Sequence, residues 1–145
     1  MKKVGIVLSS TLALAGFVAV PVAVGSSARS ASTAGPAVIV QIQTKTKTLL
    51  HSTTVRGKTG WITKGGTPSG KCSGTSAAGA LDSATHGRWT GTYYASVGAI
   101  FVSSILHVKP TGSHYWGVYV NGKFSNSGIC AIKLHKGEHL LFKVK

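Results

Sequence analysis

The chain has 145 residues, a length that fits one domain, and it carries 16 Lys and Arg but only two Asp and Glu. With Asp82 and Glu138 as the whole supply of carboxylates, a paired-carboxylate hydrolase or a magnesium site of clustered acidic oxygens has too few acidic groups. The formal net charge of +14 attracts polyanions. The basic residues are scattered along the chain, so the charge does not predict a localised patch for a specific nucleic acid.

The first 28 residues have the pattern of an export signal. Lys2 and Lys3 form a basic start, residues 4–24 are almost entirely apolar, and small residues follow. We therefore predict a signal peptide over residues 1–28 and a secreted protein, with several small residues as alternative cleavage sites. An uncleaved membrane anchor is the alternative interpretation, because the apolar run approaches the length that spans a bilayer.

A segment rich in Ser, Ala and Gly, residues 29–36, predicts a flexible tether in front of a domain of residues 37–145. The domain begins with alternating apolar residues that predict a strand, and residues 49–55 predict a second strand that pairs back as a hairpin. The apolar positions of the first strand are Val38, Val40 and Ile42. Lys45 and Lys47 lie in the connection, where lysines hinder edge-to-edge aggregation.

Residues 56–74 are rich in Gly, Lys, Thr and Ser and predict a long surface loop. Trp61 in this loop has two interpretations. We favour one in which it packs under the loop against the sheet; in the other it is an exposed binding aromatic. The apolar spacing then predicts a short helix over residues 77–84, in which Gly79 costs about 1 kcal/mol relative to Ala and which Gly87 can end.

Strands are also predicted over residues 88–94, 99–108 and 115–120. In the second of these, Val102, Leu106 and Val108 share one face. Asn121-Gly122 follows the third strand and is a strong signal for a two-residue hairpin turn.

After this hairpin, residues 130–134 predict another strand, residues 136–138 a turn, and residues 140–144 a final strand. Two strands, a short helix and several more strands predict an α+β fold in which the helix packs on one face of a mixed sheet.

Cys72 and Cys130 are the only cysteines, and both lie in the part predicted to be exported. Export favours oxidation, so we predict that they form a disulfide that staples the domain. The bridge closes a loop of about 58 residues, worth about 4 kcal/mol in the chain-entropy treatment. A redox or metal-binding role is the alternative.

The C-terminal stretch carries a family resemblance. The order Tyr115-Trp116, Asn121-Gly122, a lone Gly128, Gly137-Glu138 and a Phe142-x-Val144 end resembles the C-terminal β domain of transcobalamin and intrinsic factor. It resembles more closely a bacterial family of secreted stand-alone domains of unknown function related to that domain. Upstream, the resemblance includes Lys71-Cys72-Ser73-Gly74, the helical segment, Gly87-Arg88-Trp89 and Phe101-Val102-x-x-Ile105, so it spans roughly residues 37–144.

The resemblance implies a β-grasp-like sheet and a cysteine pair at Cys72 and Cys130. In the transcobalamin-like family this domain caps a corrinoid. The resemblance therefore implies ligand-binding contacts by Tyr115, Trp116, Asn121 and Phe124. We expect no cofactor, with cobalamin as the alternative that the resemblance implies.

The sequence pattern predicts which of these candidate contact residues lie in the core and which lie at the surface. Trp116 alternates with the apolar face of its strand and is expected in the core, whereas Tyr115, Tyr119 and the hairpin tip, residues 121–126, are expected at the surface. Exposed aromatic side chains form recognition surfaces because they supply a large contact area at low entropic cost.

Catalytic and metal-binding signals are weak. The chain has no Gly-x-Ser-x-Gly elbow and no zinc-ribbon spacing. His135 and His139 are four residues apart, but Gly137 breaks any helix that would place them on one face, so no metal site is predicted.

We therefore predict a secreted, non-enzymatic binding module for an anionic cell-envelope polymer, a partner protein or a small ligand. The alternative is a basic effector that binds polyanions or acts on membranes, such as a small nuclease or toxin-like protein. In its nuclease form, His107, Lys109 and His114 are the candidate catalytic residues. A specific nucleic acid is not expected as a partner, and membrane contact is expected only through an uncleaved leader.

Overall fold

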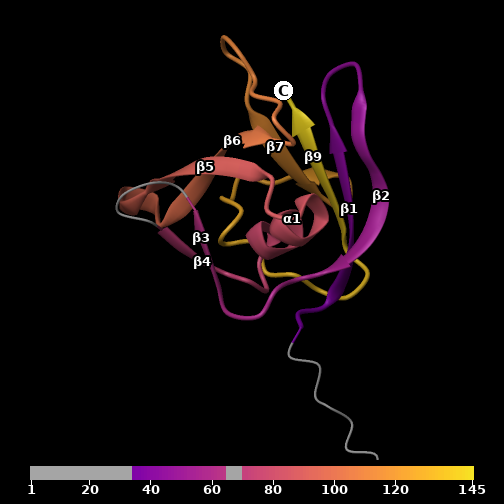
Figure 1. Ribbon diagram of the computed structural model, residues 1–145, viewed down its shortest axis with the longest axis vertical. Helices are drawn as coiled ribbons and strands as arrows, with labels where there is room; N and C mark the ends of the chain where they lie inside the picture. Colours follow the sequence, from indigo (N-terminus) through magenta and orange to yellow (C-terminus); the bar gives the residue numbers. More distant parts are fainter. Residues whose placement is uncertain (1–33, 65–69) are drawn as a thin grey trace, which may run out of the picture. The chain divides into compact units, whose positions relative to one another are not determined.

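Strand β1 lies inside a five-stranded sheet and buries one face completely, as its alternating sequence predicts. It pairs antiparallel with β2, which confirms the predicted hairpin, and parallel with β9. The sheet order is β2-β1-β9-β7-β8, so the sheet is mixed, as predicted (Figure 1). Its strands are β1 (Ala37–Gln43), β2 (Thr48–Arg56), β7 (Trp116–Val120), β8 (Lys123–Phe124) and β9 (His139–Val144).

The computed structural model describes residues 34–64 and 70–145. The predicted signal peptide, residues 1–28, and residues 29–33 of the predicted tether lie outside the described residues. Within the last three residues of that tether, Gly35 is buried and its N–H donates to the C=O of Gly57 at 3.1 Å. Among the described residues, no helix is both long enough and apolar enough to cross a membrane.

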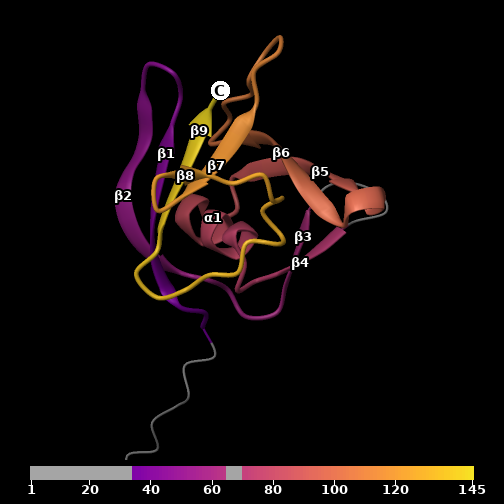
Figure 2. The ribbon, with the colours of Figure 1, turned by 180° about the vertical axis from the view of Figure 1, so that it is seen from behind.

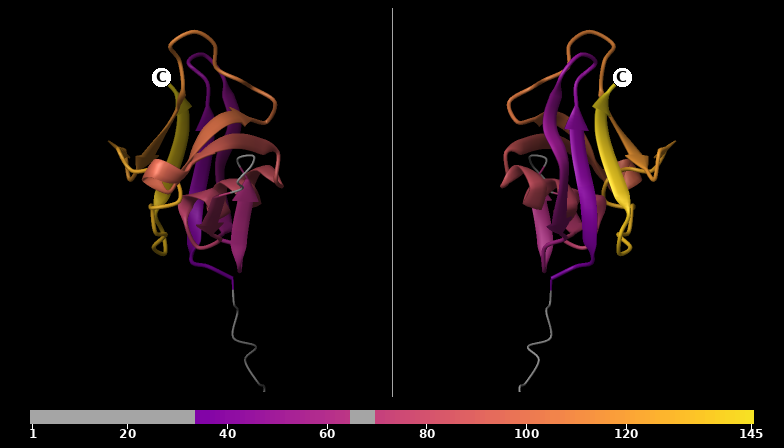
Figure 3. Two further views of the ribbon diagram at one scale, coloured as in Figure 1. Left: turned by 90° about the vertical axis from the view of Figure 1, so that its left-hand side faces the viewer. Right: turned by 90° about the vertical axis from the view of Figure 1, so that its right-hand side faces the viewer.

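Helix α1 (Ala77–Thr85) covers the buried face of the sheet. Ala77, Ala80 and Leu81, which belong to the predicted apolar stripe, are fully buried. Figures 2 and 3 show α1 and the shorter strand pairs on the same side of the sheet. The core residues that the central strands contribute are Val38, Val40, Ile42, Leu140, Phe142, Val144, Trp116 and Val118. The prediction of one short helix on one face of a mixed sheet is confirmed.

Gly79 lies where α1 comes closest to the chain before it. A Cβ added at Gly79 would overlap the carbonyl oxygen of Gly74, a backbone atom that cannot move aside as a flexible side chain would. The glycine that weakens the isolated helix is therefore required by its packing.

Replacing Gly79 by alanine is expected to destabilise the protein by about 1–3 kcal/mol, because overpacking outweighs the gain in helix propensity. Urea unfolding at neutral pH measures the effect. Ser83→Ala on the same helix is the matched control and should change the free energy of unfolding by less than about 0.5 kcal/mol. A stabilised Gly79→Ala variant would contradict the close approach of the two backbones.

Residues 56–74 contain two strands, so the prediction of one long surface loop is wrong. The strands are β3 (Trp61–Lys64) and β4 (Gly70–Ser73), which pair antiparallel. Ile62 lies opposite Cys72, and both are buried, which anchors this hairpin to the core. Trp61 points the other way and is 66% exposed, so the packed interpretation of Trp61 is wrong.

Another antiparallel pair consists of β5 (Trp89–Tyr94) and β6 (Ala99–Ile105), joined through the short 3-10 helix η1 (Ala95–Val97). The predicted strand over residues 99–108 is too long. Leu106 and His107 have φ angles of 48° and 67°, and this left-handed backbone turns the chain instead of extending it.

Residues 130–134 form no strand, and that prediction is wrong because their backbone serves the helix instead. The C=O groups of Ile129 and Ile132 accept the N–H groups of Ala78 and Ala77 at 3.2 and 2.9 Å. The first N–H groups of a helix lack partners within the helix, so this segment supplies them. Ile132 and Leu134 are buried and Cys130 is partly buried, which explains the alternating pattern without a strand.

The predicted disulfide and the predicted hairpin turn are both confirmed. Cys72 and Cys130 form a disulfide that joins β4 to the segment after β8. Asn121 and Gly122 have φ angles of 49° and 81°, the left-handed values that a two-residue hairpin turn requires, and they connect β7 to β8.

Candidate ligand groove

A groove of about 680 Å³ opens at the edge of β7. Its walls come from β7, the first half of β6 and residues 125–131, which follow β8 and are called the 125–131 segment below. The two-residue strand β8 covers the edge of β7 only at Tyr119 and Val120. The groove therefore lies where this edge is uncovered, beside Trp116 and Gly117.

Four aromatic side chains give the groove an apolar surface that solvent can reach. Tyr94, Phe101, Tyr115 and Phe124 line it and are 52%, 50%, 37% and 39% exposed. The rings of Phe101 and Tyr115 lie 6.5 Å apart between centroids, and Phe124 contacts Tyr119 edge-on at 5.4 Å. Paired aromatic rings of this kind form contact surfaces with little side-chain entropy left to lose.

The structure brings three of the four predicted contact residues to this groove. Tyr115, Trp116 and Phe124 line it, whereas Asn121 does not. The side-chain oxygen of Asn121 accepts the N–H of His139 at 2.9 Å and so fixes the hairpin turn to β9. Trp116 is 4% exposed, as the alternation predicts, and its indole N–H donates to the C=O of Val108 at 3.3 Å.

The disulfide holds one wall of the groove in place. Cys130 lies within the 125–131 segment and is bonded to Cys72 of β4, while its Sγ accepts the N–H of Ile100 at 3.3 Å. A Cβ at Gly128 would lie 2.6 Å from the Cβ of Ala99, so this segment packs closely against the start of β6. The shape of the groove therefore depends on the crosslink.

Sequence reasoning did not select Phe101 or Val97 as site residues. Phe101 alternates with Ile100 and Val102, which are buried, and thus projects from the opposite face of β6. The alternation of β6 in the sequence could have revealed Phe101, because a large aromatic residue on the outer face of a strand indicates an exposed contact residue. Val97 is 71% exposed in the short η1 helix and has no sequence signal of this kind.

Lys145 gives the rim of the groove a positive charge. Its Nζ lies 4.3 Å from the ring centroid of Phe124 and 5.8 Å from that of Tyr119. The side chain also lies over Gly117, where a Cβ would come within 3.2 Å of Lys145 Cδ. A cation over aromatic faces is held in place by the ring quadrupoles.

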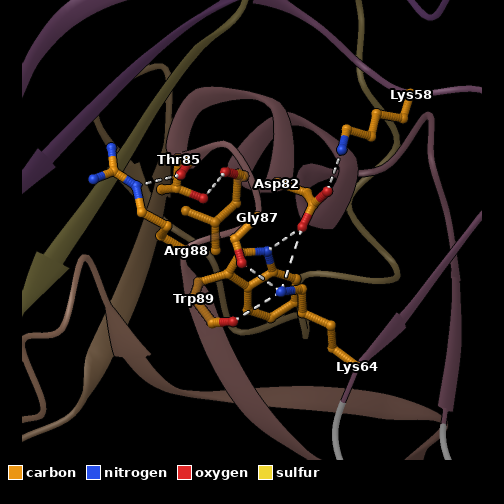
Figure 4. A network of polar contacts seen from close by, with 8 residues as sticks. Lys58, Lys64, Asp82, Thr85, Gly87, Arg88 and Trp89 are labelled. Atoms are coloured by element: carbon orange, nitrogen blue, oxygen red, sulfur yellow. Dashed lines mark hydrogen bonds and ion pairs between the residues drawn. The ribbon is translucent and has the colours of Figure 1, made fainter.

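A separate polar cluster surrounds Asp82 on α1 (Figure 4). Its Oδ2 accepts from Lys58 Nζ at 2.5 Å, and its Oδ1 accepts from the indole N–H of Trp89 at 2.8 Å. Lys64 Nζ lies 3.7 Å from Oδ1 and donates to the C=O groups of Gly87 and Trp89 at 2.6 and 3.0 Å. The cluster connects β3, α1 and β5. The charged groups of Asp82, Lys58 and Lys64 all have partners within it.

Two opposing effects act on the pKa of Asp82. Burial by itself raises the pKa of this carboxyl group, because it disfavours the charged form. The hydrogen bonds from Lys58 and Trp89 and the charges of Lys58 and Lys64 outweigh burial, so the pKa lies below the ordinary value of 3.8. Asp82 is therefore held as a carboxylate, which fits a structural ion pair better than a proton-transfer group.

The other carboxylate, Glu138, accepts the backbone N–H of His135 at 2.8 Å in the turn before β9. Across residues 34–64 and 70–145, no three His, Cys, Asp or Glu residues gather as metal ligands would. The groove beside β7, by contrast, offers a ligand an open volume of about 680 Å³.

Residues 74–145 match the sequence family described as a domain of unknown function, DUF4430. The predicted resemblance to a family of domains of unknown function is thereby confirmed. All residues that line the groove lie inside the DUF4430 match, and so does the half-cystine Cys130, whereas Cys72 lies just before it.

Two solved structures share the fold. A Ruminococcus gnavus protein provisionally described as metal binding matches with a TM-score of 0.52 and 10% identity, over 76% of this chain and 96% of its own. Haptocorrin in complex with Cbi matches with a TM-score of 0.52 and 13% identity, over 76% of this chain and 25% of its own. The chain spans about a quarter of the length of haptocorrin, and at these identities the likeness concerns the fold alone. No curated protein matches the sequence significantly.

Proposed function

We propose that this protein is a secreted binding module that holds its ligand in the groove beside β7 without chemical turnover. The observation that carries the proposal is the groove itself, an open volume of about 680 Å³ around Phe101, Tyr115 and Phe124. Volumes of this size with mostly apolar walls are typical of ligand sites. Among the described residues, no carboxylate side chain and no histidine line it, so a ligand would be held there by contact and not by acid–base chemistry.

The fold supports this function. Strands β1 and β9 lie parallel at the centre of the sheet, with an antiparallel partner outside each, which supports the predicted β-grasp-like arrangement. The haptocorrin structure contains Cbi, and a corrinoid is accordingly one ligand to test. The metal-binding description of the R. gnavus protein finds no counterpart among the described residues of this chain.

Export is part of the proposal. The basic and apolar start of the sequence supports a signal peptide over residues 1–28. The disulfide between Cys72 and Cys130 supports an oxidising compartment, because structural disulfides persist mainly outside the cytosol.

A ligand screen against the oxidised protein tests the groove. The library would contain small apolar molecules with and without acidic groups, together with a corrinoid, and thermal shift followed by calorimetry would give the affinities. The double variant Phe101→Ala/Tyr115→Ala is expected to weaken hits by at least about tenfold, because aromatic contact residues each contribute more than about 1 kcal/mol.

Trp61→Ala is the matched control for this variant. Trp61 is more exposed than either groove aromatic, and it lies on β3, outside the groove. Hits that survive the double variant but are lost in Trp61→Ala would move the binding site to β3 and overturn the proposal.

A second candidate function is polyanion binding, which the charge distribution at one end of the sheet favours. Lys45 Nζ lies 3.4 Å from His114 Nε2, so the β1–β2 turn meets the segment before β7. Lys143 near the end of β9 and Lys145 just after it lie at the same end of the sheet. The chain has no carboxylate side chain there, because Glu138 lies at the opposite end of β9 and Asp82 on α1.

The variant Lys45→Gln/Lys47→Gln tests this second function with inorganic polyphosphate as the probe. At about 0.15 M salt we expect it to weaken binding at least about fivefold more than the control Lys133→Gln/Lys136→Gln, which removes the same charge elsewhere. Equal losses in both variants would show that net charge alone attracts the polymer, and would contradict a site at this end of the sheet.

A further inference from the structure

The backbone N–H and C=O groups of successive β7 residues point alternately toward β9 and away from it. Tyr115 and Lys145 exchange N–H to C=O bonds at 3.4 and 2.9 Å, and Asn121 donates its N–H to His139 at 2.8 Å. In an antiparallel ladder, residues that bond to one side alternate with residues that bond to the other. Tyr115, Gly117 and Tyr119 therefore direct their backbone groups to β9, and Trp116, Val118 and Val120 direct theirs away from it.

The side of β7 that faces away from β9 is only partly used. β8 pairs with Tyr119 and Val120, and the C=O of Val118 accepts the N–H of Ser125 at 2.8 Å. In the described part of the chain, no turn or loop residue pairs with the N–H and C=O of Trp116 or with the N–H of Val118. These three groups lie on the edge that borders the groove.

We propose that the groove binds an extended peptide with acidic side chains, which pairs with the open edge of β7 as an added strand. This inference rests on the proposed function and names its ligand class. Unpaired N–H and C=O groups in a row form the template that strand addition uses. A planar small molecule would leave most of these directional groups without partners.

The groove reaches both faces of β7, as an added strand requires. Tyr115 and Phe124 border it on the outer face of the sheet, and Val118 and Ile129 border it on the core side. Successive side chains of a strand point to opposite faces. The bound peptide therefore places every second side chain against the aromatic rings and the intervening ones against the apolar floor.

Charge complementarity selects acidic side chains on the outer face. Lys145 Nζ lies 4.3 Å from the Phe124 ring at that rim. The only carboxylate side chains of the chain are engaged elsewhere, Asp82 by Lys58 and Trp89 and Glu138 by a backbone N–H. At a formal net charge of +14, a basic peptide is repelled and an acidic one attracted.

The experiment begins with a random heptapeptide library displayed on phage and selected against the oxidised full-length protein. The strongest binder is then synthesised with a single N-methyl group at each backbone amide in turn, and each affinity is measured by calorimetry. Methylation at alternate positions is expected to weaken binding by about tenfold or more, because each lost backbone bond is worth about that factor. Methylation at the positions between them should change it less than about threefold.

Amide exchange on the protein provides the second readout. On peptide binding, the amides of Trp116 and Val118 are expected to exchange at least about tenfold more slowly, whereas those of Gly117 and Tyr119, already bonded to β9, should not change. Lys145→Gln should weaken an acidic binder by at least about threefold more than Lys133→Gln, which removes an equal charge elsewhere.

The outcomes separate this inference from the proposed function. Small molecules that bind through Phe101 and Tyr115, with no peptide showing the alternating pattern, would overturn the peptide inference and leave the groove as a small-ligand site. An alternating pattern without protection of Trp116 and Val118 would place the added strand on another edge and also overturn it. Failure of both the small-molecule and the peptide libraries to bind would overturn the proposed function as well.

Discussion

The double variant Cys72→Ala/Cys130→Ala is expected to lower the free energy of unfolding by about 4 kcal/mol. The crosslink spans 58 residues, and a loop of this length limits the unfolded chain by about that amount. The same variant is expected to lose ligand binding in the groove at temperatures where it is still folded. Without the bond to Cys72 of β4, the 125–131 segment is no longer held against β6. Urea unfolding and calorimetry on one preparation measure both effects.

Oxidised wild type and wild type reduced by a thiol are the matched comparison, since they differ only in the crosslink. The reduced protein should match the double variant in stability and affinity. A folded double variant that binds with unchanged affinity would contradict the role of the disulfide in shaping the groove, whatever its effect on stability.

Asp82→Ala is expected to cost about 2–3 kcal/mol. It leaves the indole N–H of Trp89 without its acceptor in a buried position and removes the counter-charge of Lys64. Lys58→Ala removes only the more exposed partner, whose side chain is 46% accessible, and should cost less than about 1 kcal/mol. Equal effects of the two variants would contradict a central role for the carboxylate.

The same carboxylate gives stability a specific pH dependence. Because the pKa of Asp82 is lower in the folded protein than in the unfolded chain, its contribution is fully present above the ordinary value of 3.8 and is lost as pH falls through the folded value. Stability of the wild type should therefore fall in acid below about pH 4, and Asp82→Asn should reduce that slope. Parallel pH profiles of stability for the wild type and Asp82→Asn would show that Asp82 does not cause the loss of stability in acid.

Alternation made the sheet accessible to sequence reasoning. β1 and β9 each bury every second residue against the core, which is why their sequences alternate with a period of two. Asn121-Gly122 marked the β7–β8 turn because few residues accept the required backbone angles. The two cysteines identified the disulfide because no other pairing exists within the chain.

The alternation of apolar residues gave a wrong prediction where buried residues do not belong to a paired strand. Ile132 and Leu134 are buried, but the C=O groups of Ile129 and Ile132 accept N–H groups from the start of α1, a tertiary requirement that leaves no local sequence pattern. The loop prediction over residues 56–74 failed for the converse reason. Many polar and glycine residues concealed the pair Ile62 and Cys72, which fixes a short hairpin to the core.

The groove was only partly accessible from sequence. The family resemblance pointed to Tyr115, Trp116 and Phe124, which line it. The opposite wall comes from β6 and the 125–131 segment, and the chain brings these together only through the disulfide and the fold. The edge of β7 is open because β8 is only two residues long. A strand this short has no sequence pattern from which its end could be predicted.

The most direct test is an amide chemical-shift map of the ¹⁵N-labelled, oxidised protein titrated with the strongest ligand from the two screens. The account expects the largest shifts at Phe101, Tyr115, Phe124 and the 125–131 segment, with small shifts around Trp61. Shifts centred on Trp61, or spread evenly over the lysines, would contradict a ligand site beside β7.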